Sequence, residues 1–507
     1  MALPPRAQPQ RWRPVSEALV AHYDTLQGGW ATFVAHDRAR LACIALQDEP
    51  LQAIAPLAAS VLAAQPYRHA INLSSLAIAC VAVGRRDDAA GLLTAAEEAT
   101  RGGLHAKTQA ATYGHLATGY ARLGDAPKAQ RFRELAIAQG DAENNPGESV
   151  RSLAWSYLEA DEPARAVETL CARGLHHTAV FHAEALCDFA LRLLDAGAHA
   201  PLAALLERVE LRGRDGLLFR LLDRGFEAGL VGSWLHDARR ERRDGWVYES
   251  VLGAAAARGA LGFLASELEG VFAEPTCAPM TLRWAVALDR GAQQRAHERV
   301  SAAARSPHER FGALLALDAA LGHAAAVEGH LRAMIDPEQG TAALSVLGAA
   351  KAHEALGSLA RQLDARFADA PEPVNARAKI GAMRAFASAG LAAEAEARAA
   401  PIFSLVTAPR YPDAGVAQAL CEALAAHDMP ELAMKALRKV KGKIRRERAL
   451  REVLQLAGRC DRPEIALEAL ARFVKERPND VNPLRAALDA WELQLRRRGL
   501  WVAYDPL

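Results

Sequence analysis

The chain has 507 residues, with 61 basic and 60 acidic side chains and a formal net charge of +1. A charge so close to zero provides no global attraction to nucleic acid or membranes, so any such preference must be local. Hydrophobic residues make up 51% but aromatic residues only 6%, and alanine and leucine dominate, which favours helices and argues against gross disorder.

The N-terminal part predicts a tail followed by a helical cap. Residues 1–14 are rich in proline and arginine and lack an apolar core, so they predict a disordered tail rather than a signal peptide or an anchor. Residues 15–68 are helical in pattern but fit no repeat, which predicts a cap. The seven cysteines are scattered through apolar segments with a helical pattern. We therefore expect buried thiols in a reducing compartment, the cytoplasm.

Residues 69–212 carry a recurring spacing of apolar and small residues. The first block is Leu73, Leu76, Ala77, Cys80, Gly84, Ala89 and Leu93, and the next two run from Tyr113 through Gly124 to Ala129 and from Val150 through Asp161 to Leu170. Steps of three and four place the apolar residues on one helix face. Gly84 is predicted to end the first helix in the left-handed conformation, and small Ala89 allows the second helix to approach closely. Each block therefore predicts one helical hairpin.

The pattern weakens over residues 213–400 and returns over residues 401–480. Weaker versions pass through Gly197, Gly259, Gly322 and Asp428, and the last block comprises Leu450, Val453, Leu454, Ala457, Asp461, Ala466, Leu470 and Phe473, with Pro478 after it. We expect roughly ten to twelve hairpins. Residues 481–507 predict a C-terminal capping helix and tail, because the last repeat needs its apolar face covered.

These blocks resemble the tetratricopeptide (TPR) repeat, W-x2-L-G-x2-Y followed by Ala-x3-Phe and Pro. The four clearest blocks lack the opening tryptophan, the first three have alanine after the leucine, and only the last keeps the proline. The resemblance implies an all-α fold, an α-solenoid of antiparallel helical hairpins forming a TPR-like superhelix with divergent repeats.

No sequence motif indicates catalysis or a cofactor. Phosphate-binding loops, G-x-G-x-x-G and G-x-S-x-G are missing, and His297-Glu298, His308-Glu309 and His353-Glu354 lack the second histidine of H-E-x-x-H. The ligand-type residues His176, His177, His182, Glu184 and Cys187 have the wrong spacing for one helical face, so no metal site is predicted. We therefore expect a protein that is not an enzyme.

The segment from Lys435 to Arg451 is the strongest local signal, with nine basic residues and one acid, Glu447. The candidate partner-binding residues are Lys439, Lys441, Lys443, Arg445, Arg446 and Arg448. This segment, called the basic segment below, predicts docking of an acidic partner, a phosphorylated segment or nucleic acid. The alternative is a solvated loop whose charges favour helix C-termini. Aromatic residues for stacking bases are missing from it.

The sequence thus predicts a non-catalytic scaffold that binds a peptide or protein on a concave surface lined by first helices. The first alternative is a helical-repeat protein that binds nucleic acid or an acidic partner through residues 435–451. The second is an accessory subunit of an enzyme. The identity of the partner does not follow from the sequence.

Overall fold

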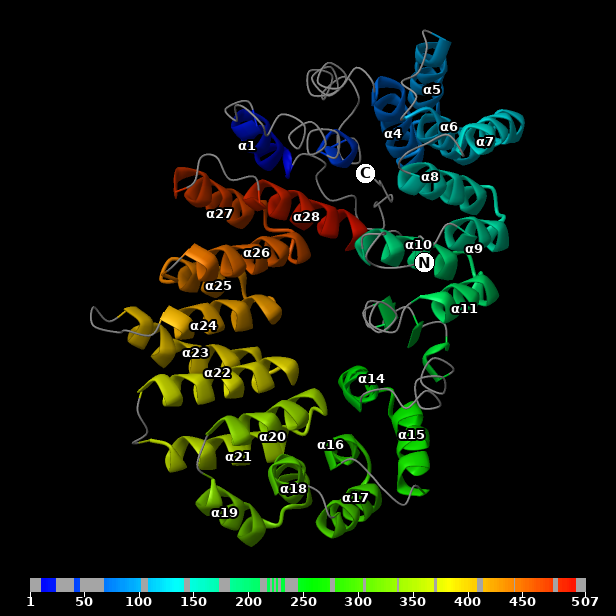
Figure 1. Ribbon diagram of the computed structural model, residues 1–507. Coiled ribbons are helices and arrows are strands. Elements are labelled where there is room, and N and C mark those ends of the chain that lie inside the picture. The colour runs from blue at the N-terminus through cyan, green and yellow to red at the C-terminus, as the bar shows by residue number, and fades with distance from the viewer. Residues whose placement is uncertain are drawn as a thin grey trace. The chain divides into compact units, whose positions relative to one another are not determined.

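In the computed structural model the described residues are 11–23, 41–45, 68–101, 108–140, 146–172, 183–209, 217–218, 221–222, 225–226, 229–232, 245–273, 279–303, 307–334, 337–368, 372–407, 414–441, 443–476 and 482–497. Within these ranges every regular element is a helix, and no strand is present. The predicted all-α fold is confirmed (Figure 1).

Successive helices form antiparallel pairs joined by short connections (Figure 1). The pairs are α4 (His69–Ala82) and α5 (Arg86–Arg101), α6 (Gln109–Leu123) and α7 (Ala126–Gly140), α8 (Pro146–Glu159) and α9 (Pro163–Ala172), α10 (Ala183–Asp195) and α11 (His199–Arg208), α14 (Gly245–Arg258) and α15 (Leu261–Ala273), α16 (Pro279–Leu282) with η2 (Arg283–Ala287) and α17 (Arg290–Ala302), α18 (Pro307–Leu321) and α19 (Ala324–Ala333), α20 (Pro337–Ala349) and α21 (His353–Arg366), α22 (Glu372–Ser388) and α23 (Ala392–Thr407), α24 (Ala414–Ala426) and α25 (Pro430–Leu437), and α26 (Lys443–Arg459) and α27 (Pro463–Glu476). Helices α1 (Arg13–Tyr23) and α28 (Asn482–Arg497) lie outside these pairs. The described residues contain eleven pairs, within the predicted range of ten to twelve.

The first helix of a pair commonly ends at a left-handed residue. Gly84 has φ of 79°, and the N–H of Arg85 donates to the carbonyl of Cys80 at 2.9 Å. Asp161 and Asp461 occupy the same place with φ of 62° and 51°. Such residues satisfy the last helical carbonyls while turning the chain back. The predicted role of Gly84 is confirmed.

The alanines that were predicted to lie between the two helices of a pair are buried. Ala89, Ala129, Ala166 and Ala466 are at most 1% exposed. Leu93, one turn after Ala89, is fully buried. The predicted apolar register is therefore the one that forms the core.

The chain folds as two compact units, and the second of the two boundaries between them along the chain falls inside α26. Unit 1 comprises Met1–Ala228 and Leu454–Leu507, and unit 2 comprises Gly229–Val453. The first helices α4, α6 and α8 pack side by side in unit 1, as α18, α20, α22 and α24 do in unit 2. The predicted segments 69–212, 213–400 and 401–480 follow the strength of the repeat pattern, and they do not coincide with these units.

Helix α23 crosses the predicted boundary between residues 400 and 401. Pro401 lies inside this helix, where it removes one backbone hydrogen bond. The next residue, Ile402, is 1% exposed. Burial of Ile402 offsets part of the cost of the proline, so the helix continues to Thr407.

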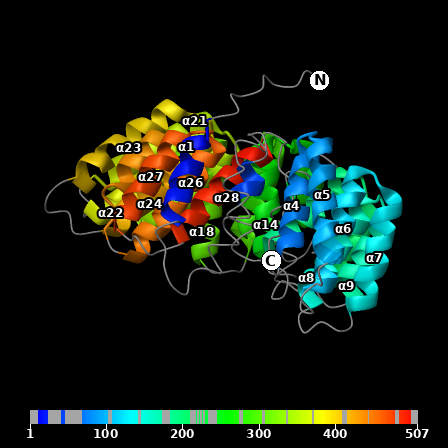
Figure 2. The same cartoon turned by 90° about the horizontal axis from the view of Figure 1, so that it is seen from above.

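The N-terminal helix of unit 1 packs on its C-terminal helices. Helix α1 contacts α27 (Figure 2). Just before it, Trp12 is 1% exposed and its ring stacks on Trp491 of α28 at 6.1 Å between centroids. The indole N–H of Trp12 donates to Oδ1 of Asp461 at 2.8 Å. The predicted tail, residues 1–14, therefore extends too far, because Pro14 is tolerated in the first turn of a helix. Residues 1–10 lie outside the described residues.

A buried ion pair joins the first helices of unit 1. Arg68 precedes α4, and its Nη1 donates to Oε2 of Glu148 in α8 at 3.1 Å. Nε2 of His115 in α6 lies 3.7 Å from Oε1 of Glu148. Burial alone raises the pKa of Glu148, but His115 and Arg68 more than compensate and lower the pKa to about 2. Glu148 is therefore charged in the folded protein near neutral pH.

Candidate functional site

The basic segment spans the end of α25, a connection and the start of α26. Lys439 and Lys441 lie in the connection and are exposed, whereas Val440 between them is 1% exposed. The Nε of Arg446 donates to the carbonyl of Val440 at 3.0 Å. Because Val440 is anchored from both its side chain and its backbone, the two flanking lysines are held at the surface.

The other predicted residues differ in their partners. Arg445 is exposed, and Arg448 pairs with Glu422 of α24 at 3.0 Å between Nε and Oε1. Lys443 is the first residue of α26, and its side chain lies outside the described part of the chain. Lys439, Lys441 and Arg445 make no ion pair with any described residue. Arg446 and Arg448, by contrast, both have partners within the described residues.

The helix dipole explains only part of the charge of this segment. Lys435 lies in the last turn of α25 and Arg438 is the C-cap residue of that helix, where a cation is favoured. Lys443, Arg445 and Arg446 lie in the first turn of α26, which contains no acidic residue. A cation there is disfavoured by roughly 0.3–1 kcal/mol. The helix dipole therefore accounts for none of the three cations in the first turn of α26.

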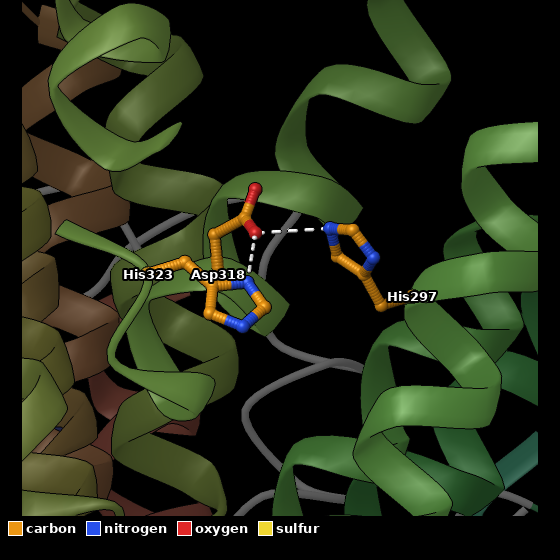
Figure 3. A group of neighbouring side chains, drawn as sticks. All are labelled: His297, Asp318 and His323. Carbon is orange, nitrogen blue, oxygen red and sulfur yellow. Dashed lines mark hydrogen bonds and ion pairs between the residues drawn. The ribbon is translucent and has the colours of Figure 1, made fainter. Parts of the chain in front are cut away.

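A second cluster, which the sequence did not predict, surrounds Asp318 in unit 2. Nε2 of His297, from α17, and Nδ1 of His323, which precedes α19, each lie 2.9 Å from Oδ1 of Asp318 (Figure 3). Nε2 of His330, in α19, lies 2.9 Å from Oδ2. Three imidazoles from two successive helix pairs therefore contact one carboxylate.

Asp318 is the buried centre of this cluster. Its side chain is 2% exposed, whereas those of His297 and His323 are 23% and 37% exposed. Burial raises the pKa of Asp318, but the hydrogen bonds with His330 and His323 and the nearby His297 lower it overall. The carboxylate is therefore charged, and His297 and His323 connect it to solvent.

No sequence motif could have identified this cluster. The three imidazoles reach Asp318 from α17, from the α18–α19 connection and from α19, and ligand motifs require fixed spacing along one segment. The predicted absence of a metal site rested on such spacing. Of the rejected ligand-type set, His176, His177 and His182 lie outside the described residues.

An open groove of about 710 Å³ lies on α21, α22 and α23 of unit 2. It is lined by His353, Glu354, Gly357, Arg361, Asp364, Lys379, Phe386, Leu391, Glu394, Ala397, Arg398 and Pro401. Arg398 pairs with Asp364 at 2.7 Å, and its guanidinium lies 4.7 Å from the ring centroid of Phe386. Basic and acidic side chains alternate here, so the groove selects no single sign of ligand charge.

No protein-family model matches the chain, and no curated protein sequence matches it. Among the described helices, none has the length and apolar character needed to cross a membrane.

Solved helical-repeat structures resemble the chain distantly. A structure of Naa15/Naa10 bound to HypK-THB has 13% identity over 96% of this chain and 80% of that chain, with a TM-score of 0.37. The pentatricopeptide repeat protein PPR10 in complex with an 18-nt psaJ RNA element has 13% identity over 96% and 86%, with a TM-score of 0.34. A circular tandem repeat protein has 14% identity over 95% and 99%, with a TM-score of 0.17. Similarity at these identities and TM-scores does not identify a binding partner for this chain. The helix pairs themselves identify the chain as a divergent helical-repeat protein with an all-α solenoid fold.

Proposed function

We propose that the protein is a non-catalytic scaffold that binds an acidic protein segment through Lys439, Lys441 and Arg445. The observation that carries this proposal is that the three exposed cations make no ion pair with any described residue. Arg445 also occupies the first turn of α26, where a cation reduces folding stability. Residues that reduce stability are expected where binding requires them.

The connection between α25 and α26 favours binding because its backbone is already held. Val440 is buried, and its carbonyl accepts a hydrogen bond from Arg446. A partner therefore meets lysines whose backbone does not have to be ordered on binding, which lowers the entropic cost of association.

A protein partner fits this surface better than nucleic acid does. Residues 430–459 contain no phenylalanine, tyrosine or tryptophan, so the surface lacks the aromatic rings on which unpaired bases stack. Carboxylate or phosphate groups on a protein segment need only the cations. The cytoplasm fits this proposal, since Cys80 and Cys421 are fully buried thiols suited to a reducing compartment.

Binding of a fluorescently labelled peptide of alternating glutamate and serine tests the proposal by anisotropy at physiological salt. The triple variant Lys439→Glu, Lys441→Glu, Arg445→Glu should weaken binding at least about tenfold, because the attraction between opposite charges becomes a repulsion at each position. Raising the salt concentration should also weaken binding of the peptide to the wild type, because salt screens the attraction between exposed charges.

The matched control reverses three exposed bases elsewhere, Arg101→Glu, Arg472→Glu and Lys475→Glu. Its net charge equals that of the first variant, so equal weakening in both would show a general charge effect and contradict the proposal. An RNA oligonucleotide that binds more tightly than the peptide under the same conditions would instead favour the nucleic-acid alternative.

A further inference from the structure

We propose that His297, Asp318 and His323 form a binding site for a divalent metal ion of the zinc class, which joins two successive helix pairs of unit 2 (Figure 3). The pairs are η2–α17 and α18–α19. None of these side chains takes part in the proposed binding of an acidic partner, so the two proposals stand or fall separately.

The positions of the ligand atoms fit such an ion. The nitrogen atoms of His297 and His323 that face Asp318 and its Oδ1 all lie within 4.8 Å of one another. The two rings are nearly perpendicular, at 88°. Two ligands of a tetrahedral ion bound at about 2.0–2.1 Å are about 3.3 Å apart. Each N–O distance is 2.9 Å, so the carboxylate has to separate from each ring by only a few tenths of an ångström.

The chemical nature of the ligands selects the class of ion. Two imidazole nitrogens and one carboxylate oxygen suit zinc and the neighbouring ions cobalt and nickel, whereas magnesium and calcium prefer oxygen ligands throughout. Three protein ligands leave a fourth position for water. The partial exposure of His297 and His323 gives water access to that position.

His330 positions the carboxylate instead of binding the ion. Its Nε2 contacts Oδ2 of Asp318, which leaves Oδ1 facing the two ligand histidines. The ring of His330 packs edge-on against Phe311, with 5.3 Å between centroids, and this contact fixes its orientation. Hydrogen bonds of this kind to a ligating carboxylate commonly contribute about 10–100-fold to metal affinity.

Metal binding requires a change in the protons of the two ligand histidines. Without an ion, a ring nitrogen must carry hydrogen to bond to the carboxylate; to bind the ion, that nitrogen must present its lone pair. When the ion binds, a ring that was neutral therefore moves its hydrogen to the other ring nitrogen. A ring that was charged releases one proton to water. The solvent exposure of His297 and His323 permits this exchange.

The fold holds the ligands in place before an ion binds. Gly322 has φ of 77°, and the backbone N–H of His323 donates to the carbonyl of Asp318 at 2.9 Å. This turn fixes His323 beside Asp318, so only His297 reaches the site from the other pair. An ion would therefore add metal–ligand bonds between two pairs that are otherwise joined by packing, by the contact of His297 with Asp318 and by a hydrogen bond from Arg290 to the carbonyl of Leu321.

The experiment uses tag-free full-length protein stripped of metal with a chelator and then incubated with zinc or cobalt. After desalting, elemental analysis should find about one ion per chain, and cobalt should give the visible absorption of a tetrahedral nitrogen–oxygen site. Zinc should also raise the thermal unfolding midpoint by several degrees, because the ion binds only the folded state. His297→Gln and His323→Gln should each abolish these effects, and His330→Gln should weaken zinc binding about 10–100-fold.

His199→Gln is the matched control, since His199 is an exposed histidine close after a left-handed glycine in unit 1. It should bind metal as the wild type does. The proposal is overturned if the wild type retains no ion. It is equally overturned if the double variant His297→Gln, His323→Gln retains the ion with unchanged cobalt absorption, because the ion would then lie elsewhere.

Discussion

Glu148 is a carboxylate whose charge is balanced by residues from two other helix pairs. Arg68 and His115 contact it from the start of α4 and from α6. Glu148 also lies in the first turn of α8, where the helix dipole favours a negative charge. These interactions stabilise the charged form of a side chain that burial alone would neutralise.

Glu148→Gln should reduce the dependence of stability on acidic pH. The pKa of Glu148 falls from an ordinary value of 4.5 to about 2 in the folded protein. Its contribution to stability is therefore complete above pH 4.5 and is lost as the pH falls towards 2, and a shift of this size corresponds to about 3 kcal/mol. Urea unfolding at neutral pH and at about pH 3 measures this change.

The control for this prediction is Glu17→Gln, which removes an exposed glutamate whose partner is Arg13. Its loss of stability between the two pH values should match that of the wild type. An equally steep loss in Glu148→Gln would show that other groups dominate the acid dependence.

Single residues were predictable where their own chemistry decides their conformation. Gly84 adopts the left-handed conformation as expected, whereas Lys351 also adopts it, with φ of 55°, and nothing in a lysine indicates this. The basic segment was visible because its residues are neighbours in sequence. The pairing of Arg448 with Glu422, like the cluster at Asp318, depends on helices meeting in space and could not be predicted.

At the scale of the elements, glycine residues determine how closely neighbouring helices pack. A Cβ at Gly348 of α20 would lie 2.3 Å from the carbonyl oxygen of Ala385 in α22, and one at Gly458 of α26 would lie 1.9 Å from that of Ala490 in α28. Both neighbouring atoms belong to backbone, which cannot rotate away as a side chain can. These glycines therefore fix the spacing of the stack within each unit.

Gly348→Ala should destabilise unit 2 by about 1–3 kcal/mol, because α20 and α22 must separate to admit the methyl group. Gly91→Ala in α5 is the matched helical control, since no atom lies within 4 Å of its added Cβ. That variant should be more stable by up to about 1 kcal/mol through helix propensity. Denaturant unfolding of both variants tests the pair, and a loss of similar size in both would contradict the close-packing argument.

Helices were predictable as elements because their apolar spacing repeats. Their exact limits were less so, since proline begins some helices and lies within others. Pro463 begins α27 and Pro14 lies in the first turn of α1, whereas Pro401 lies inside α23. Ile402, the residue after Pro401, is buried, and this burial depends on how the helix packs in the fold and not on the local sequence.

At the scale of the whole molecule, unit 1 is assembled from both ends of the chain. The sequence predicted a cap at each end of a stack, but no local pattern could show that Trp12 stacks on Trp491. The contact joins two segments that share no repeat register. It also involves the turn residue Asp461, which accepts a hydrogen bond from the indole of Trp12.

Trp12→Ala should loosen the C-terminal helices more than the rest of unit 1. Removal of a fully buried tryptophan side chain commonly costs about 3–5 kcal/mol, and this substitution removes the ring stacking on Trp491 and the hydrogen bond to Asp461. Hydrogen exchange measured by mass spectrometry should show faster exchange in α27 and α28. Trp155→Ala, which removes the packing of α8 on Phe189 of α10, should instead accelerate exchange in those two helices. Identical exchange patterns in the two variants would contradict a local role for Trp12.

The contact between Trp12 and Asp461 also determines when α1 can fold during synthesis. The two residues are separated by 449 positions in the chain, and ribosomes add roughly 5–20 residues per second, so Trp12 waits roughly 20–90 s for its partner to be made. Throughout that interval the apolar side of α1 lacks the surface that buries it. Helix α1 is thus synthesised long before Asp461, the residue that its neighbour Trp12 contacts in the folded protein.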